Sequence, residues 1–205
     1  MTTSDPATWV TTTHDWAVTV DLAHLEAIRR DPAAYAHGGA LHLVLEVMAY
    51  ADEEAAERGR RGTCVVTLHA DGSVSVADDG RGTDTRRLST GEPIRKPVMA
   101  TRDVRFFDTG HDMLLPDGHP RRGISVVAAL SVWLTHTNVR TDGAWTQRYE
   151  YGMPTSDLVP VEPTGATGTT VRFLADLRVP RAGLTAERLR AVAAFESLDV
   201  DIRSE

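Results

Sequence analysis

The chain has 205 residues, of which 41% are hydrophobic and only 6% are aromatic. This length suits one globular domain that buries roughly 70% of the surface of its extended chain, and it argues against a second domain of full size. The 22 basic and 29 acidic side chains leave a formal charge of −7, so the sequence lacks the basic excess of a protein that grips DNA or an anionic membrane directly.

Nothing in the sequence indicates export or a membrane anchor. Cys64 is the single cysteine, so neither an internal disulfide nor a cysteine cluster for zinc can form. The first six residues lack the charged head and apolar core of a signal peptide, and no apolar run approaches the roughly 18 residues of a membrane span. We therefore expect a soluble cytoplasmic protein with no membrane contact and no direct binding of nucleic acid.

The N-terminal stretch differs from the rest of the chain. Residues 1–18 are polar and rich in threonine, and they carry Trp9 and Trp16. We interpret them as an arm that is loosely attached or docked through its two indoles. Residues 19–205 are expected to form a single domain.

Two helices are predicted next. Leu22, Leu25 and Ile28 follow helical spacing, and Pro32 stops that helix. Residues 41–57 are strong helix formers, apolar nearly all round at first, so this helix is expected to be buried. Glu46 lies in its apolar part, where a carboxylate is costly unless it is paired, and we therefore treat it as a candidate functional residue with a structural ion pair as the alternative.

A hairpin and a polar loop follow. Residues 63–69 and 73–77 are typical of strands, and the Asp-Gly between them favours a tight turn. The second strand runs into Asp78-Asp-Gly-Arg-Gly82, where two glycines let the backbone approach a ligand closely. We expect this loop to be the binding site, the alternative being a solvated turn.

The second half of the chain combines an irregular stretch with further strands. Residues 83–123 contain four prolines and no clear periodicity, which is typical of a functional lid or a partly disordered segment. Beyond it we predict a buried helix, three strands and an amphipathic helix capped by Thr185, over residues 124–131, 132–140, 144–151, 171–174 and 185–195 respectively.

Five segments, in this order, resemble the N-terminal ATPase subdomain of DNA gyrase B and hence the GHKL (Bergerat) ATPase superfamily. The resemblance covers nearly the whole chain. The segments are Leu25–Tyr35, Leu41-His-Leu-Val-Leu-Glu46, Leu68–Gly82, Gly123-Ile-Ser-Val-Val-Ala-Ala-Leu-Ser131 and Thr167-Gly-Thr-Thr-Val-Arg-Phe173. It implies an α+β fold, a two-layer α/β sandwich in which helices cover one face of a mixed, mostly antiparallel sheet, with ATP or another adenine nucleotide as the ligand.

The resemblance also assigns roles at the adenine end of the site. Asp78 corresponds to the acceptor for the adenine amino group, assisted by a water that also touches Thr169. Gly80 and Gly82 belong to the loop whose backbone lies close to the base. A carboxylate that faces an exocyclic amine selects adenine over guanine, because guanine would leave the acceptor unpaired.

Further residues match the catalytic end and the edge of the pocket. Glu46 corresponds to the general base for the attacking water, and His42 to the histidine that orients it. Because His42 and Glu46 are four residues apart, they share one helix face. Glu54 and Arg81 correspond to a salt bridge that packs beside the adenine pocket.

The chain departs from the family at two places. Tyr50 stands where the family has the asparagine that ligates Mg²⁺, so no metal ligand is expected there and Mg²⁺-dependent hydrolysis does not follow. The glycine-rich lid reads Gly118-His-Pro-Arg-Arg-Gly123, which keeps Gly123 as a nucleotide contact but places Arg121 at the middle glycine. Pro120 removes an N–H from the phosphate cradle, and Arg121 or Arg122 is left to contact phosphate by its side chain.

Three functions fit these observations. The first is an adenine-nucleotide-binding protein with weak or absent ATP hydrolysis, and without the transducer or cleavage domain of a topoisomerase. The second is a pseudoenzyme, an interaction or decoy module that acts on gyrase or on a ligand of the gyrase ATP pocket. The third is an ATPase completed by a partner chain. A protein partner is thus part of the second and third hypotheses only.

Overall fold

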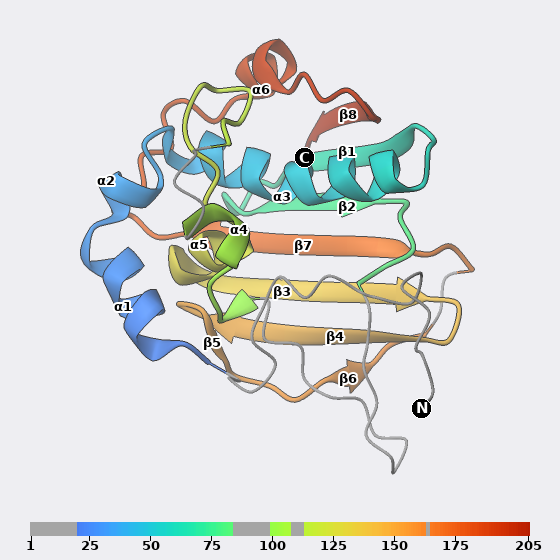
Figure 1. Ribbon diagram of the computed structural model, residues 1–205, viewed down its shortest axis with the longest axis horizontal. Coiled ribbons are helices and arrows are strands. Elements are labelled where there is room, and N and C mark those ends of the chain that lie inside the picture. The colour runs from blue at the N-terminus through green and yellow to red at the C-terminus, as the bar shows by residue number, and fades with distance from the viewer. Residues whose placement is uncertain (1–19, 84–98, 108–112, 163–164) are drawn as a thin grey trace, which may run out of the picture.

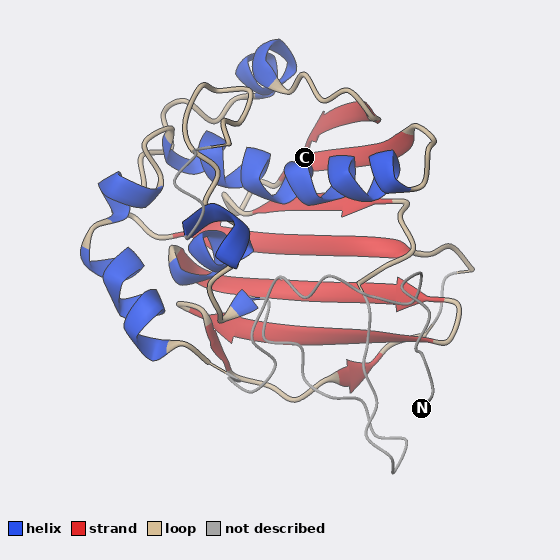
Figure 2. Ribbon diagram, in the orientation of Figure 1, coloured by secondary structure: helices blue, strands red, loops and turns tan. Residues whose placement is uncertain are grey.

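A computed structural model describes residues 20–83, 99–107, 113–162 and 165–205. Within these residues the chain forms two layers, an eight-stranded sheet and a set of helices on one of its faces (Figures 1 and 2). One strand pair is parallel and the other described pairs are antiparallel. This is the predicted α+β sandwich with a mixed, mostly antiparallel sheet.

The sheet is assembled from two hairpins and a strand that comes later in the chain. Its order is β5-β4-β3-β7-β2-β1-β8, with β6 paired to β4, so β7 lies between the β1–β2 and β3–β4 hairpins. The helices are α1 (Leu22–Arg30), α2 (Pro32–Tyr35), α3 (Gly39–Glu57), α4 (Val104–Phe107), α5 (Ile124–Ala129) and α6 (Ala186–Val192). The strands are β1 (Gly62–Leu68), β2 (Val74–Asp78), β3 (Ser131–Arg140), β4 (Gly143–Glu150), β5 (Met153–Pro154), β6 (Val159–Pro160), β7 (Gly168–Ala175) and β8 (Leu198–Ser204).

Capping aspartates set the first two helices. The Asp21 side chain accepts a hydrogen bond from the backbone N–H of His24 at 3.0 Å and so begins α1. Asp31 ends α1 and in turn accepts from the N–H of Ala34 at 3.1 Å, which begins α2 with Pro32 in its first turn. A second short helix was not predicted, although the Asp-Pro pair is a typical helix start.

The core lies between α3 and the sheet. Helix α3 is buried from Gly39 to Ala49, as its apolar composition predicts. Alternate residues on the strands face it, because side chains of a strand alternate between the two faces. The buried apolar residues of the strands include Cys64, Val66, Val74, Val76, Leu134, Val171 and Phe173.

Several predicted boundaries need correction. Helix α5 ends at Ala129 and β3 already begins at Ser131, and α6 ends at Val192, three residues before the predicted end. Strands β5, β6 and β8 and the four-residue α4 were not predicted. The predicted arm, residues 1–18, and residues 84–98 and 108–112 of the predicted lid lie outside the described residues. In the described part of the chain, no helix is both long enough and apolar enough to cross a membrane.

Candidate functional site

Strand β2 ends at Asp78, whose carboxyl group is held by the following loop and by β7. Its Oδ1 accepts hydrogen bonds from the backbone N–H of Gly80 at 2.8 Å and of Thr169 at 3.3 Å. Its Oδ2 accepts none from the part of the chain that the structure describes. Burial raises the pKa of Asp78 to about 6, although the two N–H donors oppose this. A largely buried carboxyl group with one oxygen left over is suited to accept a donor from a ligand.

The loop after Asp78 is tightly packed at its glycines. A Cβ on Gly80 would lie 2.7 Å from Cγ of Glu54, and Gly80 also accepts a 2.7 Å hydrogen bond from the Thr167 hydroxyl. Gly82 has a φ of +77°, and a Cβ there would lie 2.6 Å from the Asn138 side-chain oxygen on β3. The need for glycine at both positions is therefore explained by contacts within the protein.

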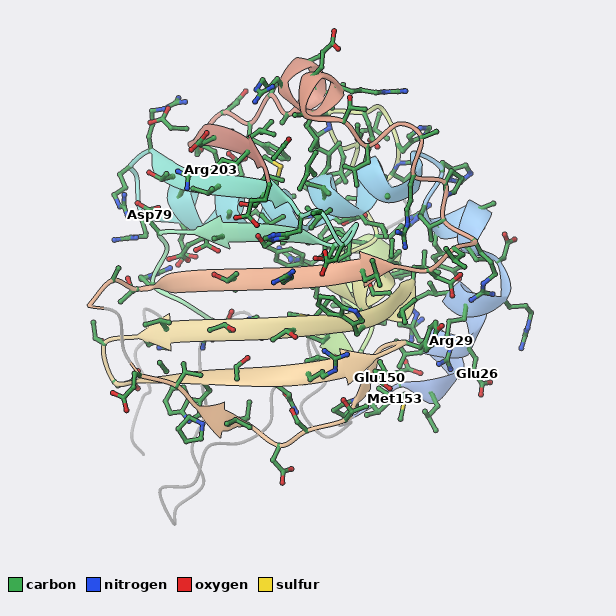
Figure 3. The ribbon with its side chains drawn as sticks, turned by 180° about the vertical axis from the view of Figure 1, so that it is seen from behind. Glu26, Arg29, Asp79, Glu150, Met153 and Arg203 are labelled. Carbon is green, nitrogen blue, oxygen red and sulfur yellow. The ribbon has the colours of Figure 1, made fainter. Side chains whose placement is uncertain are left out.

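The second aspartate of the loop has a different environment. Asp79 accepts a 2.9 Å hydrogen bond from the N–H of Thr63 and forms a 3.1 Å ion pair with Arg60. Figure 3 shows Asp79 beside the β1–β2 end of the sheet, away from Glu26 and its neighbours near α1. Asp79 is thus bound to β1 and its surroundings and does not join Asp78.

Helix α3 holds the loop through an ion pair. Glu54 accepts hydrogen bonds from Nε of Arg81 at 2.7 Å, from its Nη2 at 2.9 Å and from its backbone N–H at 3.0 Å. Burial acts against ionisation, but these bonds hold the pKa of Glu54 below its usual range. Because Arg81 is half exposed, the pair positions the loop more than it stabilises the fold.

Two turns before Glu54, α3 carries a carboxylate that is completely buried. Glu46 has no exposed surface. One of its oxygens accepts the backbone N–H of Arg122 at 2.5 Å, and the other accepts that of Gly123 at 2.8 Å. We call residues 113–123 the lid segment. Arg122 and Gly123, at its end, thus donate to both oxygens of Glu46. Glu46 fastens this segment to α3.

His42 joins the same arrangement from one turn earlier. Its Nε2 lies 3.3 Å from Glu46, and its Nδ1 lies 2.8 Å from Asp117 in the lid segment. Burial alone would lower the pKa of His42, but hydrogen bonds to Asp117 and Glu46 outweigh it and raise the pKa to about 9. A protonated His42 therefore bridges two carboxylates and adds a second attachment of the lid segment to α3.

Tyr50 lies between Glu46 and Glu54 along α3 and is hydrogen-bonded to Asp103 and to the start of α5. Its hydroxyl donates to Asp103 at 3.2 Å and accepts from the N–H of Ile124 at 3.2 Å. Burial raises its pKa well above the usual range. Gly123, with a φ of +88°, passes so close that a Cβ would lie 3.0 Å from the Tyr50 hydroxyl.

Five residues of this region escaped the sequence analysis. Glu53, Asp103, Arg105, Phe106 and Asp117 contact Tyr50, Arg121 or His42. No motif marks them, since each is recognised only through a contact with a distant part of the chain. Among the described residues, no group of three or more histidine, cysteine, aspartate or glutamate side chains is arranged to hold a metal ion.

Comparison with known proteins gives a consistent relationship. The chain is 39% identical to DNA gyrase B of Streptomyces coelicolor over 166 residues and 37% identical to that of Haloferax volcanii, also over 166 residues. These alignments cover 78% and 76% of this chain but only 24% and 26% of the relatives. The chain therefore spans about a quarter of the length of these gyrase proteins. No family model matches the chain.

A solved structure shares the fold. The ATP-binding domain of topoisomerase IV from Francisella tularensis, in complex with a small-molecule inhibitor, superposes with a TM-score of 0.67 and 22% sequence identity. The match covers 88% of this chain and 90% of that one. Sequence similarity and shared fold together show that the chain belongs to the gyrase B ATPase-like (GHKL) domains.

Proposed function

We propose that this domain binds an adenine nucleotide or an adenine-like ligand at Asp78 and hydrolyses ATP weakly or not at all. The observation that carries the binding part is the Asp78 carboxyl group, fixed through Oδ1 and left with Oδ2 as an acceptor. The 6-amino group of adenine is a matching donor, whereas guanine has a carbonyl oxygen at that position. The relatives are gyrase proteins and the similar structure is an ATP-binding domain, which agrees with this ligand class.

The residues at the adenine end fit such a ligand. Gly80 and Thr169 orient the acceptor, and the Arg81–Glu54 pair fixes the loop beside it. A fixed acceptor discriminates by the cost of leaving it unpaired, so guanine compounds are expected to bind more weakly.

The residues at the catalytic end of the candidate site, Tyr50 and Glu46 on α3, do not fit Mg²⁺-ATP. Tyr50 replaces an amide ligand with a phenol that is already bonded to Asp103 and Ile124. The general-base position, Glu46, accepts one backbone N–H of the lid segment on each oxygen and has His42 beside Oε1 at 3.3 Å, so most of its acceptor capacity is used within the protein. These contacts support impaired hydrolysis.

Calorimetric titration tests the binding part. Adenosine, ATP and guanosine are each titrated into the wild-type protein, in Mg²⁺ and in EDTA. We expect at least one adenine compound to bind and guanosine to bind more weakly. The Asp78→Asn variant should weaken adenine binding by about 1–3 kcal/mol through loss of the charged acceptor.

The neighbouring aspartate supplies the control. Asp79→Asn removes an equal charge from the same loop but leaves the proposed contact at Asp78 in place. The affinity of this variant for adenine compounds should therefore match that of the wild type. Unchanged affinity in Asp78→Asn would refute the site. Absence of binding for every adenine compound would refute the binding function and leave the interaction-module hypothesis.

Phosphate release tests the hydrolysis part. With Mg²⁺-ATP, the wild-type chain and Glu46→Gln should release phosphate at the same, near-background rate. Turnover by the wild type that Glu46→Gln abolishes would contradict the proposal and restore Glu46 as a base.

A further inference from the structure

Three residues of the candidate site lie in a row along one face of α3. Glu54, Tyr50 and Glu46 are four residues apart, so they lie on one face with successive positions about 6 Å apart along the axis. Glu54 contacts the Asp78 loop, while Glu46 contacts the lid segment. A ligand whose base lies at Asp78 and whose chain extends toward Glu46 must therefore pass Tyr50.

An arginine packs against that tyrosine. The Arg121 guanidinium lies 4.6 Å from the ring centre of Tyr50 and 4.5 Å from that of Phe106. Its two terminal nitrogens bind Glu53 at 2.5 and 3.1 Å, and the side chain is only 4% exposed. Its third nitrogen, Nε, is buried and has no acceptor in the part of the chain that the structure describes. Arg121 is thus directed into the protein.

The charged side chains of this cluster pair with one another without a ligand. Arg105 pairs with Asp103 at 2.8 Å and with Glu53 at 3.2 Å, while Arg121 shares Glu53. Asp103, only 1% exposed, also accepts from Tyr50. Two arginines therefore meet two carboxylates, and Glu46 lies one turn away. A phosphate placed along this face would meet carboxylates whose counter-charges are already engaged, with a packed ring in its path.

Resting on the proposed function, we infer that the Asp78 site takes an adenine compound that ends at its sugar, a nucleoside, and binds it without Mg²⁺. The Tyr50–Arg121–Glu53 cluster occupies the position along α3 that a phosphate chain would need. The site thereby selects against the triphosphate by both shape and charge, and the ligand class is smaller and less charged than ATP.

The wild-type protein tests this directly. Adenosine, AMP and ATP are titrated calorimetrically, each in Mg²⁺ and in EDTA. We expect adenosine to bind at least tenfold more tightly than ATP, and Mg²⁺ to change no affinity by more than twofold. ATP binding equal to or tighter than adenosine binding, or ATP binding strengthened fivefold by Mg²⁺, would overturn this inference and leave the proposed function intact. If adenosine, AMP and ATP all fail to bind, both this inference and the proposed function are overturned.

A triple variant tests the cause. Tyr50→Asn combined with Arg121→Gly and Glu53→Gln removes the ring together with both members of the ion pair, so the local net charge is unchanged. ATP affinity should rise at least tenfold while adenosine affinity stays within twofold. Tyr50→Phe is the matched control, because it keeps the ring and loses only the hydroxyl, so ATP should remain weak. Unchanged ATP affinity in a folded triple variant would overturn the inference, and the wild-type comparison decides it if that variant does not fold.

Discussion

At the scale of single residues, two neighbouring aspartates have opposite surroundings. Burial raises the pKa of Asp78 to about 6. Partial burial acts to raise the pKa of Asp79 as well, but the hydrogen bond from the Thr63 N–H and the ion pair with Arg60 hold this pKa below the usual range. One carboxylate is therefore ionised at a cost to the fold, which is typical of binding groups, while the other supports the fold.

This contrast predicts stability changes of opposite sign. The folded protein holds the Asp78 proton more tightly than the unfolded chain, so ionising this group costs stability as the pH rises from about 4 through 6. At pH 8, Asp78→Asn should therefore raise the free energy of unfolding by about 1–3 kcal/mol, measured by urea denaturation. Asp79→Asn should lower it. A destabilised Asp78→Asn would contradict the stated balance of burial and hydrogen bonding.

At the scale of elements, the lid segment is attached to α3 by charge and by backbone. Glu46 accepts two N–H groups from the segment, and His42 links Glu46 to Asp117. All of these groups are largely or wholly buried. The attachment is therefore strong in a low-dielectric setting and sensitive to loss of either partner.

Glu46→Gln should loosen the segment. A glutamine has one acceptor oxygen and a donor NH₂, so it can satisfy only one of the two N–H groups and opposes the other. We expect a loss of about 1–3 kcal/mol in the free energy of unfolding and faster hydrogen exchange at the amides of Arg122 and Gly123. Unchanged stability and exchange would indicate that Glu46 is held for another purpose.

The His42 bridge predicts a dependence on pH. Since the folded pKa of about 9 exceeds the ordinary value of 6.5, the contribution of His42 is complete below about 6.5 and is lost as the pH rises through about 9. Urea unfolding at pH 7 and pH 10 should show the wild type losing about 1–3 kcal/mol more than His42→Gln. Parallel losses in the two proteins would refute a charged bridge.

Local sequence patterns predicted the helices and strands better than they predicted the contacts between them. The β1–β2 hairpin follows from alternation around Asp-Gly, and α3 from its run of helix formers. Strand β8 was missed although its apolar residues, Leu198, Val200 and Ile202, alternate with outward-facing polar ones, a recognisable signal. Glu46 and the Asp78 loop were recognised from their local sequence, and the family resemblance supplied their roles. The role of Asp117 and the inward direction of Arg121 follow only from contacts more than 60 residues away in sequence.

At the scale of the whole molecule, the single cysteine reports on global stability. Cys64 is fully buried in β1 between α3 and the sheet, and burial raises its pKa to about 12. A thiol reagent should therefore modify it only through unfolding of the domain. A saturating ligand at 100 times its dissociation constant should slow labelling about 100-fold. Rapid labelling of the folded protein would contradict this burial.

The position of β7 has a consequence for synthesis. The two hairpins do not pair with one another and are joined through β7, which supplies the N–H of Thr169 to Asp78. On the ribosome, both hairpins emerge before Gly168–Ala175, so the Asp78 carboxyl group acquires its second donor only after β7 has been made. A nascent chain is therefore unable to recognise the ligand until most of the domain has been made.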